Sequence, residues 1–436
     1  MLDPRSFVLC AALLASSTGL AEAPVPLPIP ESIPESIPES IPESITESIT
    51  ESIPESIPES IPESIPRAED GANPLTPVRI ALQWSPQSQF AGFYLAREQG
   101  LYAAAGADVR FVHANANRSS LDWLQKGDAE LATAFLADAM VAAANADAAS
   151  NSAGEATSDA SGDASDDDGS DNRTGARRPV LIGQLVQRSN LMLLAWKDRG
   201  IEHLEDLNGQ RVSLWPGPFT ASVHALLSAR RIAPELIPQY GTVNLFLHGG
   251  VSACAAMEYN EYHRIWQAGV DADRLTAFLL RDFGFDFPED GLYARADWLE
   301  QHGALARRLW QATLKGWEYA RAHPPQAIDL VMAEAERAQV PTNRPHEHWM
   351  LKHLLASIFL DDIEEPRTSA RLSAAAHAAT AKALVAAERI DKALPLAVFC
   401  PGCGEKDQQG PNSTHARARP SGVPNDNTDA KLDENP

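Results

Sequence analysis

A strand pattern that runs directly into a helix pattern, within residues 78–106, is the feature that most constrains how this chain can fold. Apolar residues alternate over residues 78–82, as they do in a strand with one buried face. After a loop that carries Trp84, aromatic residues recur at helical spacing, namely Phe90, Phe93, Tyr94 and Tyr102. Ligands of open α/β sheets bind at such strand ends, so Trp84 is either a core residue or one wall of a ligand site.

The same alternation of strands and helices continues along the chain and predicts an α/β fold. We expect strands at residues 108–113, 130–135, 180–186, 191–196, 211–215 and 275–280. We expect helices at residues 119–126, 136–144 and 262–268, and over most of the chain between residues 297 and 391. This rhythm is typical of parallel sheets that are covered by helices.

Three stretches have compositions that cannot bury a core. Residues 31–66 repeat Glu-Ser-Ile-Pro nine times, with Thr replacing Pro twice. Proline at such short intervals forbids a helix, so residues 22–76 predict a disordered linker, which is either a spacer arm or an expansion with no specific role. Residues 145–178 predict a disordered acidic insertion within a domain, and residues 404–436 predict a disordered tail.

The charge and the N-terminus limit the partners and the location. The net charge is −23 over 436 residues, and 17 acidic residues lie in the repeat and in residues 147–171. Such acidity argues against nucleic acid and anionic membranes as partners. Arg5, an apolar run and small residues up to Ala21 predict a signal peptide over residues 1–21 and a periplasmic location. No stretch reaches the roughly 20 apolar residues of a membrane span, so we expect no direct membrane insertion.

Polar and aromatic residues near the expected strand ends are the candidate ligand-binding residues. They are Trp84, Phe90, Tyr94, Phe135, Asp138, Trp215, Phe219, Thr220, Glu258, Tyr259 and Asn260. Aromatic rings can stack on a flat solute, and the Glu258 carboxylate can accept hydrogen bonds from donors at its edge. The alternative readings are that Trp84 belongs to the core, that Thr220 is an ordinary helix N-cap, and that Glu258 is a salt-bridged surface acid.

Several short motifs follow one another in a characteristic order. They are Trp84-Ser85-Pro86, Phe90-Ala91-Gly92-Phe93-Tyr94, Arg97-Glu98-Gln99-Gly100-Leu101-Tyr102, Gln125-Lys126-Gly127-Asp128-Ala129-Glu130, Asp206-Leu207-Asn208-Gly209-Gln210-Arg211-Val212 and Met257-Glu258-Tyr259-Asn260-Glu261-Tyr262-His263. In this order they resemble periplasmic solute-binding proteins of the nitrate, sulfonate and thiamine-pyrimidine group, a family shared with fungal pyrimidine-precursor synthases. The resemblance covers about residues 78–400, apart from the acidic insertion.

The resemblance implies a type II periplasmic-binding-protein fold, in which two α/β lobes enclose a ligand cleft. Residues 77–185 and 290–400 would form the first lobe, and residues 186–289 the second. It also implies a solute-binding component of an ABC importer, with a permease and an ATPase as partners and no cofactor. Because an anion would be repelled by Glu258, we expect a thiamine pyrimidine precursor of the formylaminopyrimidine or hydroxymethylpyrimidine type. A nitrate- or sulfonate-type ligand and a secreted sensor module are the alternatives within binding proteins.

An enzymatic function is the alternative from another class. The related synthases bind pyridoxal phosphate through a Lys, use a His and carry a CCCFC run. The matching segment here, residues 132–138, contains neither Lys nor His, and the CCCFC run does not occur. A Schiff base needs the Lys, so the sequence favours a binding protein.

Two further motifs suggest metal or redox chemistry at first sight. Cys400 and Cys403 form one CxxC, which is redox-active, half of a zinc site or a local disulfide; we expect the disulfide in an oxidising compartment. His346, His348 and His353 lie on one expected helix without HExxH spacing, so we expect a solvated helix face.

Overall fold

The computed structural model describes residues 74–115, 117–158, 177–217, 219–360 and 370–403. These residues belong to one compact unit. The expected signal peptide (residues 1–21), nearly all of the expected linker (residues 22–76) and the expected tail (residues 404–436) lie outside the described residues.

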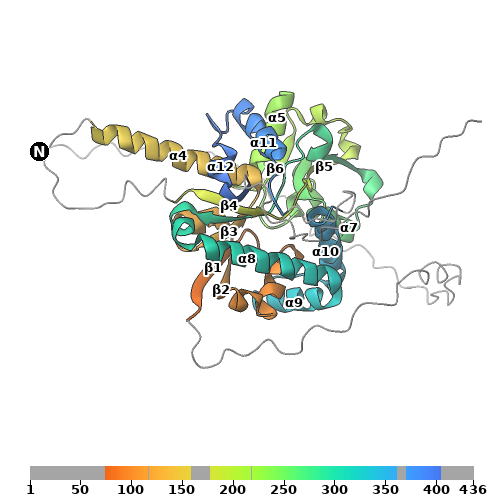
Figure 1. The fold of residues 1–436 in the computed structure, drawn as a ribbon. Coiled ribbons are helices and arrows are strands. Elements are labelled where there is room, and N and C mark those ends of the chain that lie inside the picture. The colour runs from red at the N-terminus through yellow and green to blue at the C-terminus, as the bar shows by residue number, and fades with distance from the viewer. Residues whose placement is uncertain (1–73, 116, 159–176, 218, 361–369, 404–436) are drawn as a thin grey trace, which may run out of the picture. The chain divides into compact units, whose positions relative to one another are not determined.

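Two five-stranded sheets organise the described residues (Figure 1). The first sheet has the order β2-β1-β3-β10-β4. Its strands are β1 (Thr76–Leu82), β2 (Ala107–His113), β3 (Leu131–Ala134), β4 (Pro179–Gln184) and β10 (Gly291–Arg295). β1 runs parallel to β2 and β3, whereas β10 runs antiparallel to β3 and β4.

The second sheet has the order β7-β6-β8-β5-β9. Its strands are β5 (Leu191–Trp196), β6 (Arg211–Leu214), β7 (Glu235–Pro238), β8 (Ala253–Met257) and β9 (Leu275–Leu279). β6 runs parallel to β7 and β8, and β5 runs antiparallel to β8 and β9. We call the residues around the first sheet the first lobe and those around the second sheet the second lobe.

The chain crosses between the lobes twice, after β4 and before β10. The two crossing segments are joined by backbone hydrogen bonds, in which Leu185 and Val186 donate to the Asp290 carbonyl and Glu289 donates to the Val186 carbonyl. The first sheet is therefore completed by a strand, β10, that the chain adds only after it has built the second sheet.

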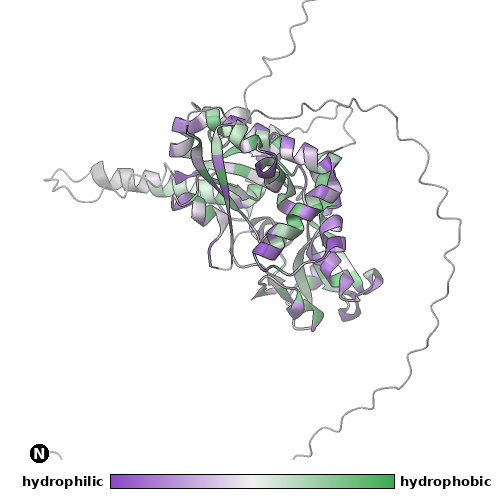
Figure 2. Ribbon diagram, turned by 90° about the horizontal axis from the view of Figure 1, so that it is seen from below, coloured by the Kyte–Doolittle hydropathy of each residue, from purple (hydrophilic) through white to green (hydrophobic). Residues whose placement is uncertain are grey.

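Helices cover the sheets and carry alternating hydrophobic and hydrophilic stretches, as expected for helices with one face in a core (Figure 2). They are α1 (Ala91–Glu98), α2 (Leu101–Ala104), α3 (Ser120–Gln125), α4 (Leu136–Ser158), α5 (Ala221–Arg230), α6 (Asn244–Leu247), α7 (Glu261–Gln267), α8 (Ala296–Ala322), α9 (Pro324–Arg337), α10 (Arg344–Ile358), α11 (Ala374–Ala386) and α12 (Leu396–Phe399). In β1, Ile80 belongs to the core formed with α1 and α8, whereas Ala81 belongs to the core formed with α3 and α4. The alternation in the sequence thus places successive side chains in different cores.

A close approach of α1 and α8 explains two glycines. A side chain at Gly92 would begin 2.3 Å from the Trp317 indole, and one at Gly316 would begin 2.1 Å from the Gly92 carbonyl oxygen. Trp317 is fully buried against this glycine. The Phe-Ala-Gly-Phe-Tyr motif therefore sets the packing of α1 on α8.

The first part of the expected disordered insertion, residues 145–158, is helical in the structure. Helix α4 continues to Ser158. Residues 159–176 lie outside the described residues, and the last two residues of the expected insertion, 177 and 178, are described again. The Ala-rich sequence after residue 141 explains this continuation, because Ala has the highest helix propensity. Strands β7 and β10 are also present where the sequence analysis placed no strand.

The C-terminal part of the described chain returns to the first lobe. Cys400 and Cys403 form a disulfide, and α12 packs beside β4. Within the described ranges, no helix combines the length and apolar character that a membrane crossing requires.

Candidate functional site

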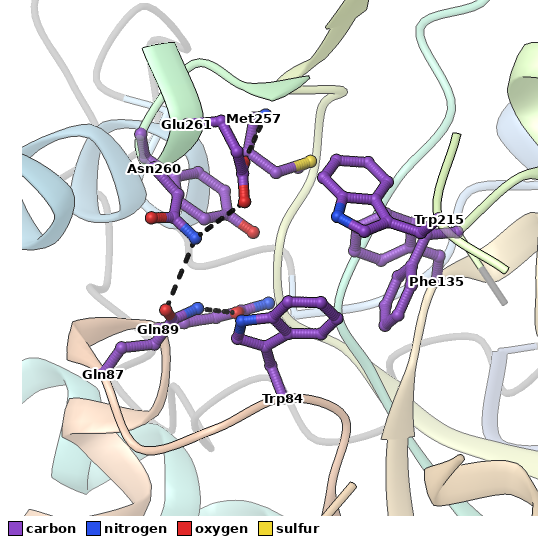
Figure 3. A pocket seen from close by; sticks show the side chains of 10 residues that line it. Trp84, Gln87, Gln89, Phe135, Trp215, Met257, Asn260 and Glu261 are labelled. Carbon is purple, nitrogen blue, oxygen red and sulfur yellow. Dashed lines mark hydrogen bonds between the residues drawn. The ribbon is translucent and has the colours of Figure 1, made fainter. Parts of the chain in front are cut away.

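The strands of both sheets end around one small cavity, which we call the inner pocket. Its solvent-accessible volume is about 20 Å³. Its lining residues are Trp84, Gln87, Gln89, Phe135, Trp215, Phe219, Met257, Tyr259, Asn260 and Glu261. They follow β1, β3, β6 and β8, so both lobes contribute to it. Figure 3 shows the polar side chains of Gln87, Gln89, Asn260 and Glu261 on one side, and Phe135 and Trp215 on the other.

Four rings form an aromatic cluster on one side of the inner pocket. Trp84 meets Trp215 at 6.4 Å and Phe219 at 5.6 Å between ring centroids, with interplanar angles of 74° and 82°. Phe219 also meets Phe135 at 5.1 Å and 77°. The rings therefore contact one another edge to face, as aromatic pairs prefer.

Phe219 lies at the centre of this cluster in an unusual backbone conformation. Its φ is 80°, in the left-handed region that bulky side chains rarely adopt. Such conformations persist where the surrounding structure holds them, and they cluster at ligand sites. The contacts with Trp84, Phe135 and Trp215 provide that support.

The polar side of the pocket is one hydrogen-bonded chain across the lobes. Gln87 Nε2 donates to Gln89 Oε1 at 2.7 Å, and Gln89 Nε2 donates to Asp290 Oδ2 at 2.8 Å. Asn260 Nδ2 lies 3.1 Å from Glu261 Oε1 and 3.5 Å from Gln87 Oε1. All four pocket side chains are buried. They offer both donors and acceptors to a ligand edge.

The orientation of Asn260 is set by partners outside the pocket. Its Oδ1 accepts from Arg264 Nε at 2.9 Å and lies 3.1 Å from His346 Nε2, so its Nδ2 faces the pocket. His346 therefore carries its proton on Nε2, and its Nδ1 accepts from His263 Nδ1 at 3.0 Å. His263 belongs to α7 of the second lobe and His346 to α10, so this pair joins two elements across the pocket rim.

Burial governs the charges near the pocket. Desolvation raises the pKa of Glu261, although the Met257 N–H at 2.9 Å opposes the shift. Desolvation lowers the pKa of His346 to about 3, with Arg264 and His263 adding to the effect, and it also lowers the pKa of His263. Both imidazoles are therefore neutral in this structure at pH 7.

Two consecutive acids, Glu289 and Asp290, lie in the crossing segment behind the pocket. Glu289 accepts from the Asn190 N–H at 2.7 Å, the Asn190 side chain at 2.9 Å and the Ser189 hydroxyl at 3.0 Å. Asp290 accepts from the side chains of Gln83 and Gln89. Burial raises the pKa of Glu289 to about 8 and that of Asp290 to about 6. These acids tie the crossing segments to the loop that carries the pocket glutamines.

The inner pocket brings together six of the residues singled out in the sequence. They are Trp84, Phe135, Trp215, Phe219, Tyr259 and Asn260. Glu258 does not line it: its carboxylate pairs with Arg281 at 2.7 Å, and its position is taken by Glu261. The turn after β8 directs Glu258 to Arg281 and begins α7 at Glu261, so Glu261 is the carboxylate that lines the pocket in this structure.

Four other candidates also lie outside the pocket lining. Phe90 and Tyr94 are fully buried on α1 or just before it, and Tyr94 Oη lies 3.3 Å from His113 Nε2. The Thr220 hydroxyl donates to the Gly217 carbonyl at 3.0 Å, so it does not cap α5. Asp138 instead accepts from the Ala221 N–H at the start of α5, and burial raises its pKa to about 6. It is a carboxylate of the first lobe that caps a helix of the second.

The sequence analysis missed Gln87, Gln89, Met257 and Glu261. Gln87 and Gln89 follow Trp84 in the same loop, so their proximity to that residue was the available signal. The expected solvated face of α10 was also wrong for His346, which is 1% exposed. Its helix packs beside α7.

A second, wider cavity, which we call the outer groove, lies on the other side of the aromatic cluster. Its solvent-accessible volume is about 480 Å³, and it is lined by the same four aromatic residues. Polar side chains that also line it are Gln83, Ser85, Asn115, Asn117, Arg118, Ser119, Ser120, Asp122, Gln239 and Tyr240. The aromatic cluster therefore separates two compartments. Among the described residues, no group of three or more His, Cys, Asp or Glu side chains could hold a metal ion.

A family model described as "NMT1/THI5 like" matches residues 87–152 and 176–327, which together are half of the chain. The chain belongs to the NMT1/THI5-like family. The matched ranges contain the inner-pocket residues of both lobes apart from Trp84.

This NMT1/THI5-like chain is similar to a riboflavin-binding protein and to two proteins of known structure. The riboflavin-binding protein RibY of Chloroflexus aurantiacus is 25% identical over 274 residues, 61% of this chain and 68% of that protein. The aliphatic sulphonate binding protein SsuA of Escherichia coli is 16% identical, with a TM-score of 0.50 over 79% of this chain and 96% of its own. The Candida albicans CA3427 product, described as having the generic periplasmic binding protein fold, is 12% identical, with a TM-score of 0.51 over 75% of this chain and 96% of its own. The fold is the two-lobed periplasmic-binding-protein fold.

Proposed function

We propose that this protein is the solute-binding component of an ABC importer and that it captures a small planar heteroaromatic molecule. The observation that carries the proposal is the inner pocket, in which aromatic rings face a chain of amides and a carboxylate. Rings provide stacking surfaces, and the polar chain provides directed hydrogen bonds to a ring edge.

The chemistry of the pocket favours this class over nitrate and sulfonate. The residues that line it include the Glu261 carboxylate and neither Lys nor Arg. An anion would meet a buried acid without a compensating cation, which is unfavourable at low dielectric. A heterocycle with both N–H and carbonyl or ring-nitrogen groups matches Asn260, Gln87 and Glu261.

Two solute types fit this class. A thiamine pyrimidine precursor of the formylaminopyrimidine or hydroxymethylpyrimidine type is the one that the sequence motifs favour. A flavin is the second, because this chain is similar to a protein named as riboflavin-binding, and the similarity spans about two thirds of that protein's length. Both present a flat ring with a donor–acceptor edge.

The mechanism is the closure of the two lobes over the solute. The crossing segments around Val186 and Glu289 are short and are the natural hinge. Closure brings Trp84 of the first lobe against Trp215 and Asn260 of the second. We propose that the protein acts in the periplasm and that the closed form docks on a membrane permease, which an ATPase drives.

The test is a thermal-shift screen followed by calorimetry on the purified protein. A ligand at 100 times its Kd adds about 2.7 kcal/mol to the free energy of unfolding. Hydroxymethylpyrimidine, formylaminopyrimidine and riboflavin should include a stabilising ligand, and nitrate and taurine should not stabilise. Stabilisation by nitrate or taurine alone would overturn the proposal.

A further inference from the structure

The inner pocket in this structure is smaller than the ring of a planar solute. Its solvent-accessible volume of about 20 Å³ holds about one water molecule, because one water needs roughly 10–15 Å³ of such volume. The outer groove offers about 480 Å³ on the other side of the aromatic cluster. A ring can therefore enter the inner pocket only if one of the four aromatic side chains between the two spaces moves towards the groove.

Phe219 is the side chain of the cluster that is best placed to move. Phe135 and Trp215 are buried, with 4% and 5% of their surface exposed, whereas Trp84 and Phe219 are only partly buried. The Trp84 backbone is anchored, since its carbonyl oxygen accepts a hydrogen bond from His113 Nδ1 at 2.6 Å. Phe219 also lines the outer groove, so this groove provides the space into which its ring can turn.

The backbone at Phe219 favours such a movement. Its φ of 80° is strained for a residue with a bulky side chain, and strain of this kind is found at ligand clamps and switch regions. A Cβ added at Gly217 would meet no heavy atom within 4 Å, so the chain is not tightly packed just before Phe219. A movement of the ring that lets the backbone relax recovers the strain and offsets part of the aromatic contacts that are lost.

The Phe219 ring lies where a solute ring would contact all the other rings of the cluster. Its centroid is 5.6 Å from that of Trp84, 5.1 Å from that of Phe135 and 6.1 Å from that of Trp215. A solute ring in this place makes the same kind of aromatic contact. A heteroaromatic ring also offers hydrogen bonds to the polar side of the pocket, which a phenyl ring cannot make.

We propose that the Phe219 ring is a plug that occupies the place of the solute ring, and that it turns into the outer groove when the solute binds. The inference rests on the proposed function and names a residue that determines its specificity. An aromatic hydrocarbon offers only the contacts that Phe219 already makes, so it does not displace the plug. A heteroaromatic solute displaces it, because hydrogen bonds to Asn260 and Glu261 add to those contacts.

The experiment compares two variants that each remove one phenyl ring from the same cluster, Phe219→Ala and Phe135→Ala. Hydroxymethylpyrimidine and riboflavin are the probes, and stopped-flow tryptophan fluorescence and calorimetry measure their binding. Phe219→Ala removes the plug, so it should raise the association rate constant at least about tenfold and strengthen binding at least about threefold. Phe135→Ala removes a wall and should weaken binding at least about fivefold.

The unaltered protein and a conservative variant provide the controls. In the unaltered protein, the observed association rate should level off at high probe concentration, because movement of the plug limits it. Phe219→Tyr keeps the ring and should retain this behaviour, whereas in Phe219→Ala the rate should rise linearly with concentration. Circular dichroism melting verifies that the variants fold. Structural damage would weaken binding, so it cannot produce the gain that is expected for Phe219→Ala.

The outcomes separate this inference from the proposed function. If Phe219→Ala weakens binding as Phe135→Ala does, Phe219 is a wall, and the plug inference is overturned while the proposed function stands. An association rate that is linear in the unaltered protein and unchanged in Phe219→Ala also overturns the plug alone. If neither probe binds to the unaltered protein or to Phe219→Ala, and no other heteroaromatic molecule of the screen binds, the proposed function itself fails.

Discussion

In the first lobe, β1 lies between two parallel neighbours, β2 and β3, and in the second lobe β6 lies in the same way between β7 and β8. A tryptophan follows each central strand: Trp84 comes after β1 and Trp215 after β6. The two indoles meet across the cavity at 6.4 Å. Equivalent strand ends therefore supply matching aromatic walls.

The neighbouring strands end differently. β3 is followed by Phe135, which joins the aromatic cluster, whereas β8 is followed by Tyr259, Asn260 and Glu261. The sheets thus determine where the site lies, and the loops after β3 and β8 determine its chemistry. The aromatic side chains of the pocket come from both lobes, and its polar side chains come from the second lobe together with two glutamines of the first.

The largest expected effect tests the matching walls. Trp84→Ala and Trp215→Ala should each weaken solute binding about 30-fold, because each removes a buried aromatic contact worth about 2 kcal/mol. Calorimetry measures the loss. Trp266→Ala is the control, since Trp266 is 49% exposed and does not line the pocket. A loss confined to one of the two indoles would show that the walls are not equivalent.

The next effect tests the polar end of β8 with a matched pair of acids. Glu261→Gln should weaken binding about tenfold, because it changes the charge and hydrogen-bonding pattern of a buried acceptor. Glu258→Gln should leave affinity within about twofold, since Glu258 pairs with Arg281 away from the pocket. The opposite order of effects in calorimetry would restore Glu258 as the ligand-binding acid.

A smaller effect concerns the contact between Asp138 of the first lobe and the start of α5 in the second. Asp138→Ala removes this cap and should weaken binding about fivefold, as expected for about 1 kcal/mol lost in the closed state. Asp138→Asn keeps an acceptor and should lose less. Equal losses in both variants would mean that the carboxylate charge matters and the cap does not.

The smallest effect is a pH dependence from the His263–His346 pair. Its depressed pKa values mean that the closed form holds both imidazoles neutral, whereas an opened form with ordinary pKa values near 6.5 takes up protons. The contribution to closure is complete above pH 6.5 and is lost as the pH falls. Affinity should decrease about threefold between pH 7 and pH 6.

The control for this prediction is His346→Gln, which should remove that part of the pH dependence. Arg264 and His353 also face the pair or its neighbours and oppose a second positive charge. Glu289 and Asp290 contribute with the opposite sign, because their raised pKa values favour the protonated form in this state. A pH profile that is the same in the variant and in the unaltered protein would contradict the role of the pair.

Local sequence patterns predicted most strand and helix positions well. They predicted the residues of the candidate site only in part. The run that became β5 was predicted at its observed bounds, because Leu191–Trp196 is continuously apolar. β10 was missed because it is short and pairs only with distant strands. Helix α4 was cut short because the Asn, Asp and Ser residues from Asn145 onward concealed its helical continuation.

Within the site, the sequence predicted which types of residue lie near the strand ends better than it predicted where their side chains point. The aromatic residues after β1, β3 and β6 were recognised because strand ends in this fold class face the ligand. Glu258 and Glu261 could not be distinguished, since they differ by a single turn that only the start of α7 resolves. One partner of Asn260, His346, comes from α10, nearly 90 positions along the chain, so no local pattern could have revealed it.

The tight approach of Gly92 to Trp317 has a consequence for how relatives should be grouped. The motif from Phe90 to Tyr94 helps to carry the family resemblance. Its residues pack α1 against α8 and do not line the inner pocket. Two proteins can share that motif in full and transport unrelated molecules. Under the proposed function, relatives that bind the same solute should match this chain at Gln87, Asn260 and Glu261, which line the pocket.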